Sequence, residues 1–228
     1  MLSIYYHKKI DFDAPAERIP ICLLIQTSGR MQPYKQQLKK AAETLIEALS
    51  SHVDTYEKTD FEIITFDSFQ NVTIKIEMQE LYNIVNKGKL KNEYESCIDF
   101  RCGGYAPIGY GLKVAIGELI NRYKFLKENG MAPRTPILLV ISGGLPSVAE
   151  SLQVEHDRVL AEELAHIRCL VSNKRLIVYV IEFDWQQNAH SDSSEYKLMQ
   201  DITGLDNDER IIRYAEDDLK GFFQRWIL

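Results

Sequence analysis

The stretch Ile19-Pro20-Ile21-Cys22-Leu23-Leu24-Ile25-Gln26-Thr27-Ser28-Gly29-Arg30-Met31 decides the fold of this chain. Its first seven residues are almost continuously apolar, which is typical of a strand buried on both faces of a parallel sheet. Small polar residues follow at 26–29, and apolar residues recur at helical spacing over 38–49. The pattern predicts a central strand, a polar turn and an amphipathic helix. In open α/β sheets, functional sites lie beyond the carboxyl ends of such strands, so this turn is the first candidate site.

Strands and amphipathic helices alternate along the rest of the chain. A short link separates the strands predicted at 61–66 and 71–76, so these two are expected to form an antiparallel hairpin. The alternation predicts an α/β fold: a three-layer α/β/α, doubly wound domain with a mostly parallel six-stranded sheet and one antiparallel edge strand. The expected strand order is 3-2-1-4-5-6, with Ile19 to Ile25 at the centre. The other predicted elements are strands at 136–141, 176–181 and 211–214 and helices at 108–120, 154–171 and 219–227, with polar loops at 87–106 and 185–195.

The chain is predicted to be one domain, residues 17–228, preceded by a surface arm, residues 1–16. Its 228 residues are 45% hydrophobic and 26% charged, which is ordinary for a globular protein with a sizeable core. The net charge of −6 provides no basic footprint for nucleic acid or for an anionic membrane. No apolar run approaches the roughly 20 residues of a spanning helix, and the first residues lack the features of a signal peptide. We therefore expect a cytoplasmic protein.

The four cysteines fit a reducing compartment. Cys22 in the central strand and Cys169 on an apolar helix face are predicted to be small buried hydrophobic residues. Cys97 and Cys102 lie in a polar loop and could pair or bind metal. The chain has no matching second pair and no nearby histidine, so free thiols are the preferred interpretation.

Four local motifs follow one another along the chain. They are Leu24-Ile25-Gln26-Thr27-Ser28-Gly29-Arg30-Met31, Ile64-Thr65-Phe66-Asp67-Ser68, Gly103-Gly104-Tyr105-Ala106-Pro107-Ile108-Gly109 and Val140-Ile141-Ser142-Gly143-Gly144-Leu145-Pro146. In this order they resemble the von Willebrand factor A (vWA) family over nearly the whole chain. The closest resemblance is to the vWA proteins of tellurium-resistance gene clusters (TerY-like).

The resemblance implies a metal-ion-dependent adhesion site (MIDAS), in which an Asp and two Ser of the first loop, a Thr of the second and an Asp of the third hold a divalent cation. Here the matching positions are Gln26, Ser28, Arg30, Tyr105 and Gly143. Both carboxylates are replaced and a guanidinium stands near the expected cation. Neutral oxygens alone hold magnesium poorly, and a fixed positive charge repels it. We therefore expect a degenerate site that binds no metal, and no cofactor.

Two interpretations of this altered loop remain open. In the first, the site has decayed and only packs. In the second, Arg30 supplies the positive charge that the metal once provided, because arginine is always charged and grips a carboxylate bidentately. Asp67 is a possible internal ion-pair partner for Arg30. Tyr105 is either a packing residue over the altered site or an aromatic residue of an interface.

The sequence lacks the motifs of common catalytic sites. It has no P-loop, no Gly-x-Gly-x-x-Gly after the first strand and no Gly-x-Ser-x-Gly elbow, and its five histidines show no metal-ligand spacing. We therefore expect a non-enzymatic protein-protein interaction module. The resemblance implies a bacterial stress-response or defence system and a kinase, phosphatase or ATPase partner from the same gene cluster. The alternative is an enzyme or a binder of anionic small ligands that uses the same cleft, with Arg30 gripping the anion.

Overall fold

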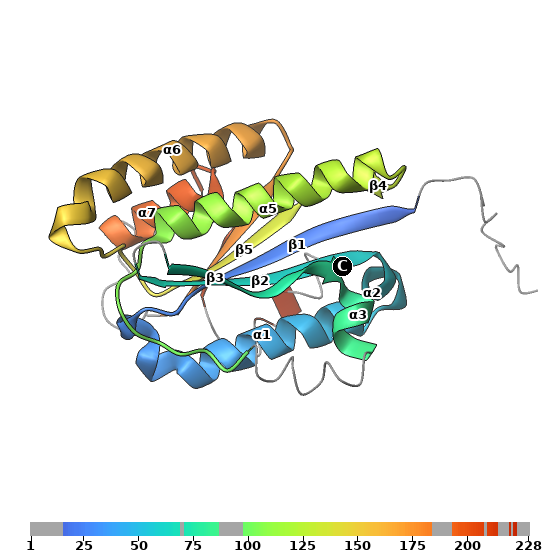
Figure 1. Cartoon of the computed structure of the whole chain (residues 1–228), viewed down its shortest axis with the longest axis horizontal. Helices are drawn as coiled ribbons and strands as arrows, with labels where there is room; N and C mark the ends of the chain where they lie inside the picture. The colour runs from blue at the N-terminus through green and yellow to red at the C-terminus, as the bar shows by residue number, and fades with distance from the viewer. Residues whose placement is uncertain are drawn as a thin grey trace, which may run out of the picture.

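The computed structural model describes residues 16–68, 71–86, 98–183, 193–207, 209–213, 219, 221 and 222. Helices and strands alternate along this part of the chain (Figure 1). In chain order, the elements are β1 (Glu17–Gln26), the 3₁₀ helix η1 (Gly29–Tyr34), α1 (Lys35–Ser50), α2 (Val53–Lys58), β2 (Thr59–Ser68), β3 (Asn71–Glu80), α3 (Leu81–Asn86), α5 (Ile108–Glu128), β4 (Ala132–Pro133), β5 (Ile137–Ser142), the 3₁₀ helix η2 (Glu150–Leu152), α6 (Gln153–Ser172), β6 (Ile177–Glu182), α7 (Ser194–Thr203) and β7 (Ile211–Arg213).

The sheet has the predicted order and the predicted central strand. Its strands follow one another as β3-β2-β1-β5-β6-β7, and the two-residue β4 pairs with the start of β1 outside this path. The β2–β3 pair is antiparallel, and the other pairs are parallel. Every residue of β1 after Glu17 is buried, as a strand covered on both faces requires. The mixed sheet with one antiparallel edge strand is thus confirmed.

Helices cover both faces of the sheet, so the three-layer prediction is confirmed (Figure 1). Side chains of β1 alternate between the two faces. Leu23 packs in a core with Leu45 of α1, whereas Leu24 packs in a second core with Leu112 of α5 and Met199 of α7. Two cores therefore share one central strand, which is the arrangement expected for a doubly wound sheet.

Several segments differ from their predicted structure. Helices α2 and α7 and strand β4 were not predicted. Asp67 and Ser68 continue β2 instead of forming a link. Residues 193–195, predicted as loop, belong to the start of α7, whose N-cap Ser193 accepts a hydrogen bond from the Tyr196 backbone N–H at 3.2 Å. A capping hydroxyl of this kind satisfies one of the free N–H groups that begin every helix.

Several predictions lie outside the described residues. They include nearly all of the predicted N-terminal arm, most of the two polar loops and the end of the last predicted helix. Of that helix, Leu219 and Phe222 are described, and both are buried in the core beside α1. Within the described part of the chain, no helix is both long enough and apolar enough to cross a membrane.

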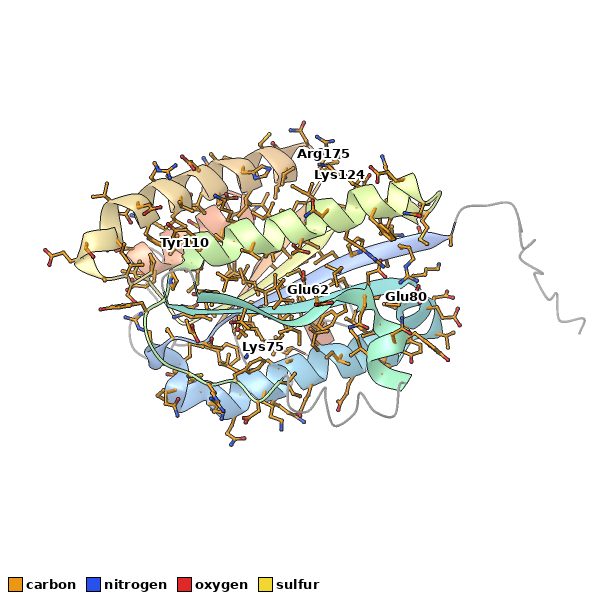
Figure 2. The ribbon with its side chains drawn as sticks, in the orientation of Figure 1. Glu62, Lys75, Glu80, Tyr110, Lys124 and Arg175 are labelled. Carbon is orange, nitrogen blue, oxygen red and sulfur yellow. The ribbon has the colours of Figure 1, made fainter. Side chains whose placement is uncertain are left out.

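A buried carboxyl group, Glu62, lies between the sheet and α5 (Figure 2). It stands on β2 opposite Cys22 of β1. Burial, followed by the charge of Glu118 on α5, raises its pKa to about 8. Neither of its carboxyl oxygens has a hydrogen-bond partner among the described residues. A protonated carboxyl group is therefore favoured here near neutral pH, because a charge without a partner is costly to bury.

Candidate functional site

Backbone hydrogen bonds tie three chain segments together at the carboxyl edge of the sheet. The Thr27 N–H donates to the Phe66 carbonyl at 2.9 Å, at the end of β2. The Gly103 N–H donates to the Thr27 carbonyl at 2.8 Å, and the Gly29 N–H donates to the Gly104 carbonyl at 3.1 Å. The first two loops of the predicted site are thus held against each other. Their positions follow from parallel strands that end at one edge of the sheet.

A network around the Gln26 side chain fills the centre of this site. Its Nε2 donates to Ser28 Oγ at 2.7 Å. Its Oε1 accepts two hydrogen bonds, one from Ser142 Oγ at 2.9 Å and one from the Gly143 N–H at 3.0 Å. Gln26, Ser28 and Ser142 are each at most 2% exposed. The amide therefore joins the first loop to the third, and these polar groups satisfy one another without an ion.

Met31 occupies the space beside Gly143. A Cβ atom built on Gly143 would collide with the Met31 sulfur atom, and Met31 is fully buried in the core beneath. A larger residue at position 143, such as the Asp of the family motif, would therefore require Met31 to move. The packing therefore gives a steric reason for glycine at this position.

Arg30 lies on the surface above this packed loop. Its Nη1 donates to the Gly143 carbonyl at 3.2 Å. Its guanidinium occupies the space that a side chain at Gly144 would need, and Gly144 has a φ of +125°. The Cγ of Glu195, in the first turn of α7, lies beside the same space. The structure therefore brings an acidic residue near Arg30 that the sequence patterns did not indicate.

Tyr105 and Asp67 lie on the same edge of the molecule. Tyr105 is 46% exposed, next to Ala106, which pairs with Ser147 in an isolated bridge. Asp67 is partly exposed near the end of β2, and its charge raises the pKa of the Cys102 thiol, although burial is the larger cause. The ion pair between Arg30 and Asp67 stays a prediction. The exposed Tyr105 suits an interface better than the closure of a core.

The donor atoms of this site suit hydrogen bonding better than metal coordination. The buried oxygens of Gln26, Ser28 and Ser142 are neutral, and the nearby cation is Arg30. Within the described residues, no group of three or more His, Cys, Asp or Glu side chains could hold a metal ion. Hard divalent cations prefer sites with carboxylate ligands, so these residues do not fit the family's cation.

The cysteine predictions require one correction. Cys169 is exposed on α6 instead of buried, because the inner face of this helix is formed by other residues, among them Ile167 and Val171. Cys22 is buried as predicted, and its pKa is raised well above the usual value by burial and then by Glu62. Cys102 is a partly buried free thiol, and Cys97 lies outside the described residues.

Sequence reasoning missed three residues that shape the site: Met31, Ser142 and Glu195. Met31 and Ser142 stand inside the quoted motifs, but only their spatial neighbours reveal what they do. Glu195 could have been found from the start of α7. The signals were a capping serine at 193, an acidic residue in the first turn, apolar residues at helical spacing and Gly204 at the end.

The geometry defines a vWA-like fold in which Arg30 and Tyr105 are exposed at the carboxyl edge of the sheet. No protein-family model matches this sequence, and a search of curated proteins found no significant match. Solved structures do match. One is a protein described as a von Willebrand factor type A from Catenulispora acidiphila, with a TM-score of 0.54 and 13% identity, covering 92% of this chain and 42% of that one.

Two other solved structures extend the comparison. The pilus adhesin SpaC from Lactobacillus rhamnosus GG has a TM-score of 0.64 at 8% identity, over 92% of this chain and 30% of that one. Manganese-loaded TRAP protein from Plasmodium vivax has a TM-score of 0.60 at 14% identity, over 92% of this chain and 75% of that one. The chain spans about a third of the length of the adhesin. At these identities the likeness establishes the fold.

Proposed function

We propose that this chain is a non-enzymatic protein-interaction module that binds its partner without metal, through the edge around Arg30 and Tyr105. The observation that carries the proposal is the buried network of Gln26, Ser28, Ser142 and Gly143. It fills a degenerate MIDAS with mutually bonded neutral groups. The network leaves Arg30 exposed directly above a rigid loop.

The loss of metal chemistry favours direct recognition by side chains. In a metal-dependent relative, a partner's carboxylate would complete the coordination of the cation. Here the guanidinium of Arg30 is a positive charge at this edge, held by the Gly143 carbonyl at 3.2 Å. A guanidinium binds a carboxylate through two parallel hydrogen bonds, so it can receive the same acidic group. Arg30 thereby replaces the cation in function.

Tyr105 supplies the apolar part of the proposed contact. Its side chain is 46% exposed, and its loop is fixed to the first loop by the Gly29–Gly104 and Gly103–Thr27 hydrogen bonds. Tyrosine and arginine are both enriched among the residues that contribute most of the binding energy at protein interfaces. A partner that presents an Asp or Glu next to an apolar residue would match both side chains.

The resemblance to TerY-like proteins supports a setting for this interaction. We place it in the cytoplasm of a bacterium, in a stress-response or defence system encoded by one gene cluster. The partner would be a kinase, a phosphatase or an ATPase from that cluster. Among the described residues of the predicted site, no nucleophilic side chain lies next to a side chain that could act as its base. We therefore assign the chain no catalytic role.

The test is affinity capture from the native host, followed by calorimetry with the purified partner. If a partner carboxylate contacts Arg30, Arg30→Ala should weaken the complex by about 2–5 kcal/mol, as for the loss of one member of an interfacial charge pair. Arg30→Lys should restore only part of the affinity, because lysine lacks the planar fork. The complex should form equally well in EDTA.

The control is Arg134→Ala, which removes an exposed arginine at the opposite edge of the sheet. Its complex should keep the wild-type affinity. Unchanged affinity for Arg30→Glu would exclude direct contact by Arg30. A complex that dissociates in EDTA would contradict metal-independent binding.

A further inference from the structure

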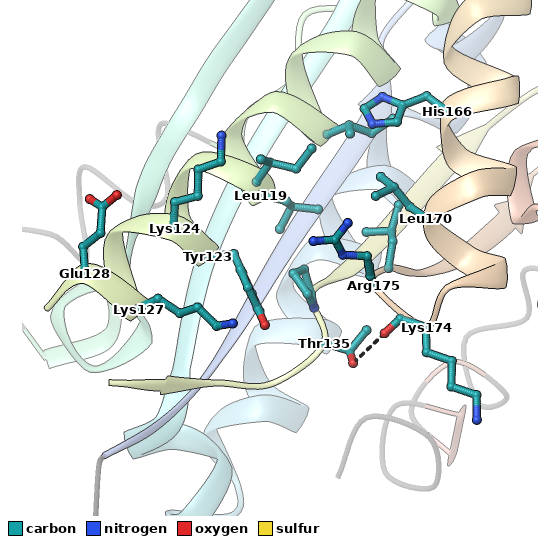
Figure 3. Close-up of a pocket in the computed structure, with 14 residues that line it drawn as sticks. Leu119, Tyr123, Lys124, Lys127, Glu128, Thr135, His166, Leu170, Lys174 and Arg175 are labelled. Atoms are coloured by element: carbon teal, nitrogen blue, oxygen red, sulfur yellow. Dashed lines mark hydrogen bonds between the residues drawn. The ribbon is translucent and has the colours of Figure 1, made fainter. Parts of the chain in front are cut away.

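A pocket of about 630 Å³ opens between α5 and α6, at the edge of the sheet opposite Arg30 (Figure 3). Pro136 and Leu176, which precede β5 and β6, lie at its base, whereas Gly143 follows β5 at the other edge. A strand of six residues separates the two edges by roughly 20 Å. The pocket is therefore a second site, distinct from the proposed interaction edge.

The floor of the pocket is apolar. Its side chains come from α5, the end of α6 and the two strand entries. They are Ile116, Leu119, Ile120, Tyr123, Pro136, Leu170 and Leu176. The volume falls within the range of about 300–1,000 Å³ that is typical of small-molecule sites, which are lined in the same way by apolar side chains with a few polar groups.

The rim of the pocket is strongly basic. Lys124, Lys127, Lys174, Arg175 and His166 line it, together with a single carboxylate, Glu128. The ion pairs formed within the described residues use none of Lys124, Lys127 and Arg175. The chain as a whole carries a net charge of −6, so this gathering of cations opposes its overall charge. Local basic clefts of this kind concentrate anions.

The cationic groups differ in how they face the pocket. In Figure 3 the guanidinium of Arg175 is turned toward the apolar side chains, whereas Lys174 points away from them. The Lys127 ammonium lies 5.0 Å from the centre of the Tyr123 ring, which holds it beside the floor. The Lys174 carbonyl accepts a hydrogen bond from Thr135 Oγ1 at 3.2 Å, and this bond fixes the turn that carries Arg175.

We propose that this pocket binds a small anionic amphiphile, a single aliphatic chain that ends in a carboxylate or phosphate. The chain would lie on the floor between α5 and α6, and the head group would bind Arg175 and the two lysines of α5. Burial of the chain supplies affinity in proportion to its apolar area, and the charged rim selects for the anionic head. A neutral lipid would match only the apolar floor of the pocket, and a simple anion would match only its basic rim.

Calorimetric titration of the whole chain tests the proposal, with decanoate and decyl phosphate kept below the concentrations at which they form micelles. We expect saturable binding of one molecule per chain for at least one of the two, and the stronger binder identifies the head group. Acetate, inorganic phosphate and decanol should each bind at least tenfold more weakly, because each lacks either the chain or the charge.

Charge-reversal variants locate the binding site. Lys124→Glu combined with Arg175→Glu should weaken binding at least tenfold, and Leu170→Trp, which fills the floor, should do the same. Lys113→Glu is the matched control, since Lys113 is an exposed lysine of α5 outside the pocket. Circular dichroism checks that each variant is folded.

Three results would overturn the proposal. The first is the absence of saturable binding by both decyl compounds to the wild-type chain. The second is equal binding by wild type and the folded Lys124→Glu, Arg175→Glu variant. The third is binding to vesicles of anionic phospholipid without binding of the monomeric amphiphiles, which would indicate a membrane-facing surface instead of a pocket.

Discussion

At the scale of single residues, one side chain decides the chemistry of the predicted metal site. Gln26 has the shape of a glutamate but is neutral, and its side-chain amide both donates and accepts hydrogen bonds. Its Nε2 donates to Ser28 Oγ, and its Oε1 accepts from Ser142 Oγ and from the Gly143 N–H, so the network forms without burying a negative charge. The loop is thus preorganised by hydrogen bonds between neutral groups.

Titration with magnesium or manganese should accordingly show no saturable site, and the melting temperature should be the same in EDTA as in excess manganese. A metal that does not bind adds no mass-action stability. Calorimetry and thermal unfolding provide the measurement. Serine hydroxyls remain at 28 and 142, so a melting temperature that rises with manganese would show that they still recruit an ion.

Glu62 should make stability depend on pH. Its folded-state pKa of about 8 lies above the usual value of 4.5, so the folded chain keeps a proton that the unfolded chain has lost between these values. Stability therefore falls as pH rises from about 4.5 to 8, and the fall ends above the folded-state pKa. Glu62→Gln removes this loss.

At pH 9 the free energy of unfolding of Glu62→Gln should exceed that of the wild type by several kcal/mol, at most about 5. At pH 5 the two values should differ much less. Chemical unfolding at both pH values measures the difference. Glu118→Gln should produce a smaller effect in the same direction, since Glu118 adds to the shift after burial. Parallel pH profiles for wild type and Glu62→Gln would contradict the assignment.

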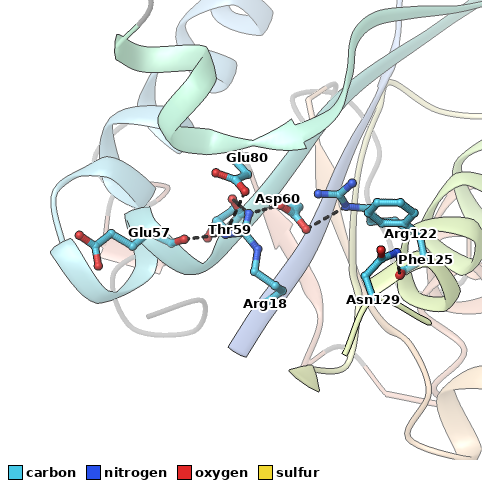
Figure 4. Close-up of polar contacts among 8 residues, drawn as sticks. All are labelled: Arg18, Glu57, Thr59, Asp60, Glu80, Arg122, Phe125 and Asn129. Carbon is cyan, nitrogen blue, oxygen red and sulfur yellow. Dashed lines mark hydrogen bonds and ion pairs between the residues drawn. The ribbon is translucent and has the colours of Figure 1, made fainter. Parts of the chain in front are cut away.

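At the scale of elements, a buried ion network joins two strands and two helices at the amino edge of the sheet (Figure 4). Asp60 of β2 is fully buried and accepts from Arg18 of β1 and from Arg122 of α5, the latter at 2.9 Å. Arg18 also donates to the Glu57 carbonyl of α2 at 2.8 Å. Asp60 thus pairs with two cations from neighbouring elements, and Glu80 of β3 lies 3.8 Å from the Nη1 atom of Arg18.

Asp60→Asn should lower the free energy of unfolding by about 3–5 kcal/mol, because it leaves Arg122 facing a neutral amide and Arg18 with the more distant, partly exposed carboxylate of Glu80 at 3.8 Å. Denaturant unfolding measures the loss. Glu17→Gln is the control at the same edge: Glu17 pairs with Lys58 and Arg134 but is partly exposed, so its loss should cost at most about 1 kcal/mol. Similar costs for both variants would show that burial does not strengthen the Asp60 network.

At the scale of the whole molecule, the central strand unites two cores. Leu23 and Leu24 are neighbours in sequence, yet they pack on opposite faces of the sheet. Both cores contain side chains of β1, so a loss of packing on one face of the sheet also weakens the packing on the other face. The two helical layers should therefore unfold together.

Leu23→Ala and Leu24→Ala should each reduce stability by about 2–5 kcal/mol, the usual cost of truncating a fully buried leucine. Each variant should still unfold in one transition, with coincident curves from near- and far-ultraviolet circular dichroism. Separate transitions in either variant would indicate that the two layers are independent.

The sequence by itself determined the layers, the strand order, the central strand and the edge on which the candidate site lies. These features follow from the periodicity of apolar residues, which is a local property that every segment carries. The short helix α7 escaped prediction although its cap, its apolar spacing and its final glycine are all present in the sequence. The antiparallel β2–β3 pair was predictable because its two strands are adjacent along the chain.

Only the tertiary structure decided how the site is filled and where the pocket opens. Ser142 reaches Gln26 across 116 positions of sequence, and the Met31 sulfur occupies the space beside Gly143. The pocket likewise exists because α5 and α6 pack with a gap above the entries to β5 and β6. Such contacts depend on the relative placement of distant segments, and the side-chain volumes and hydrogen-bond partners that meet there leave no periodic trace in the sequence.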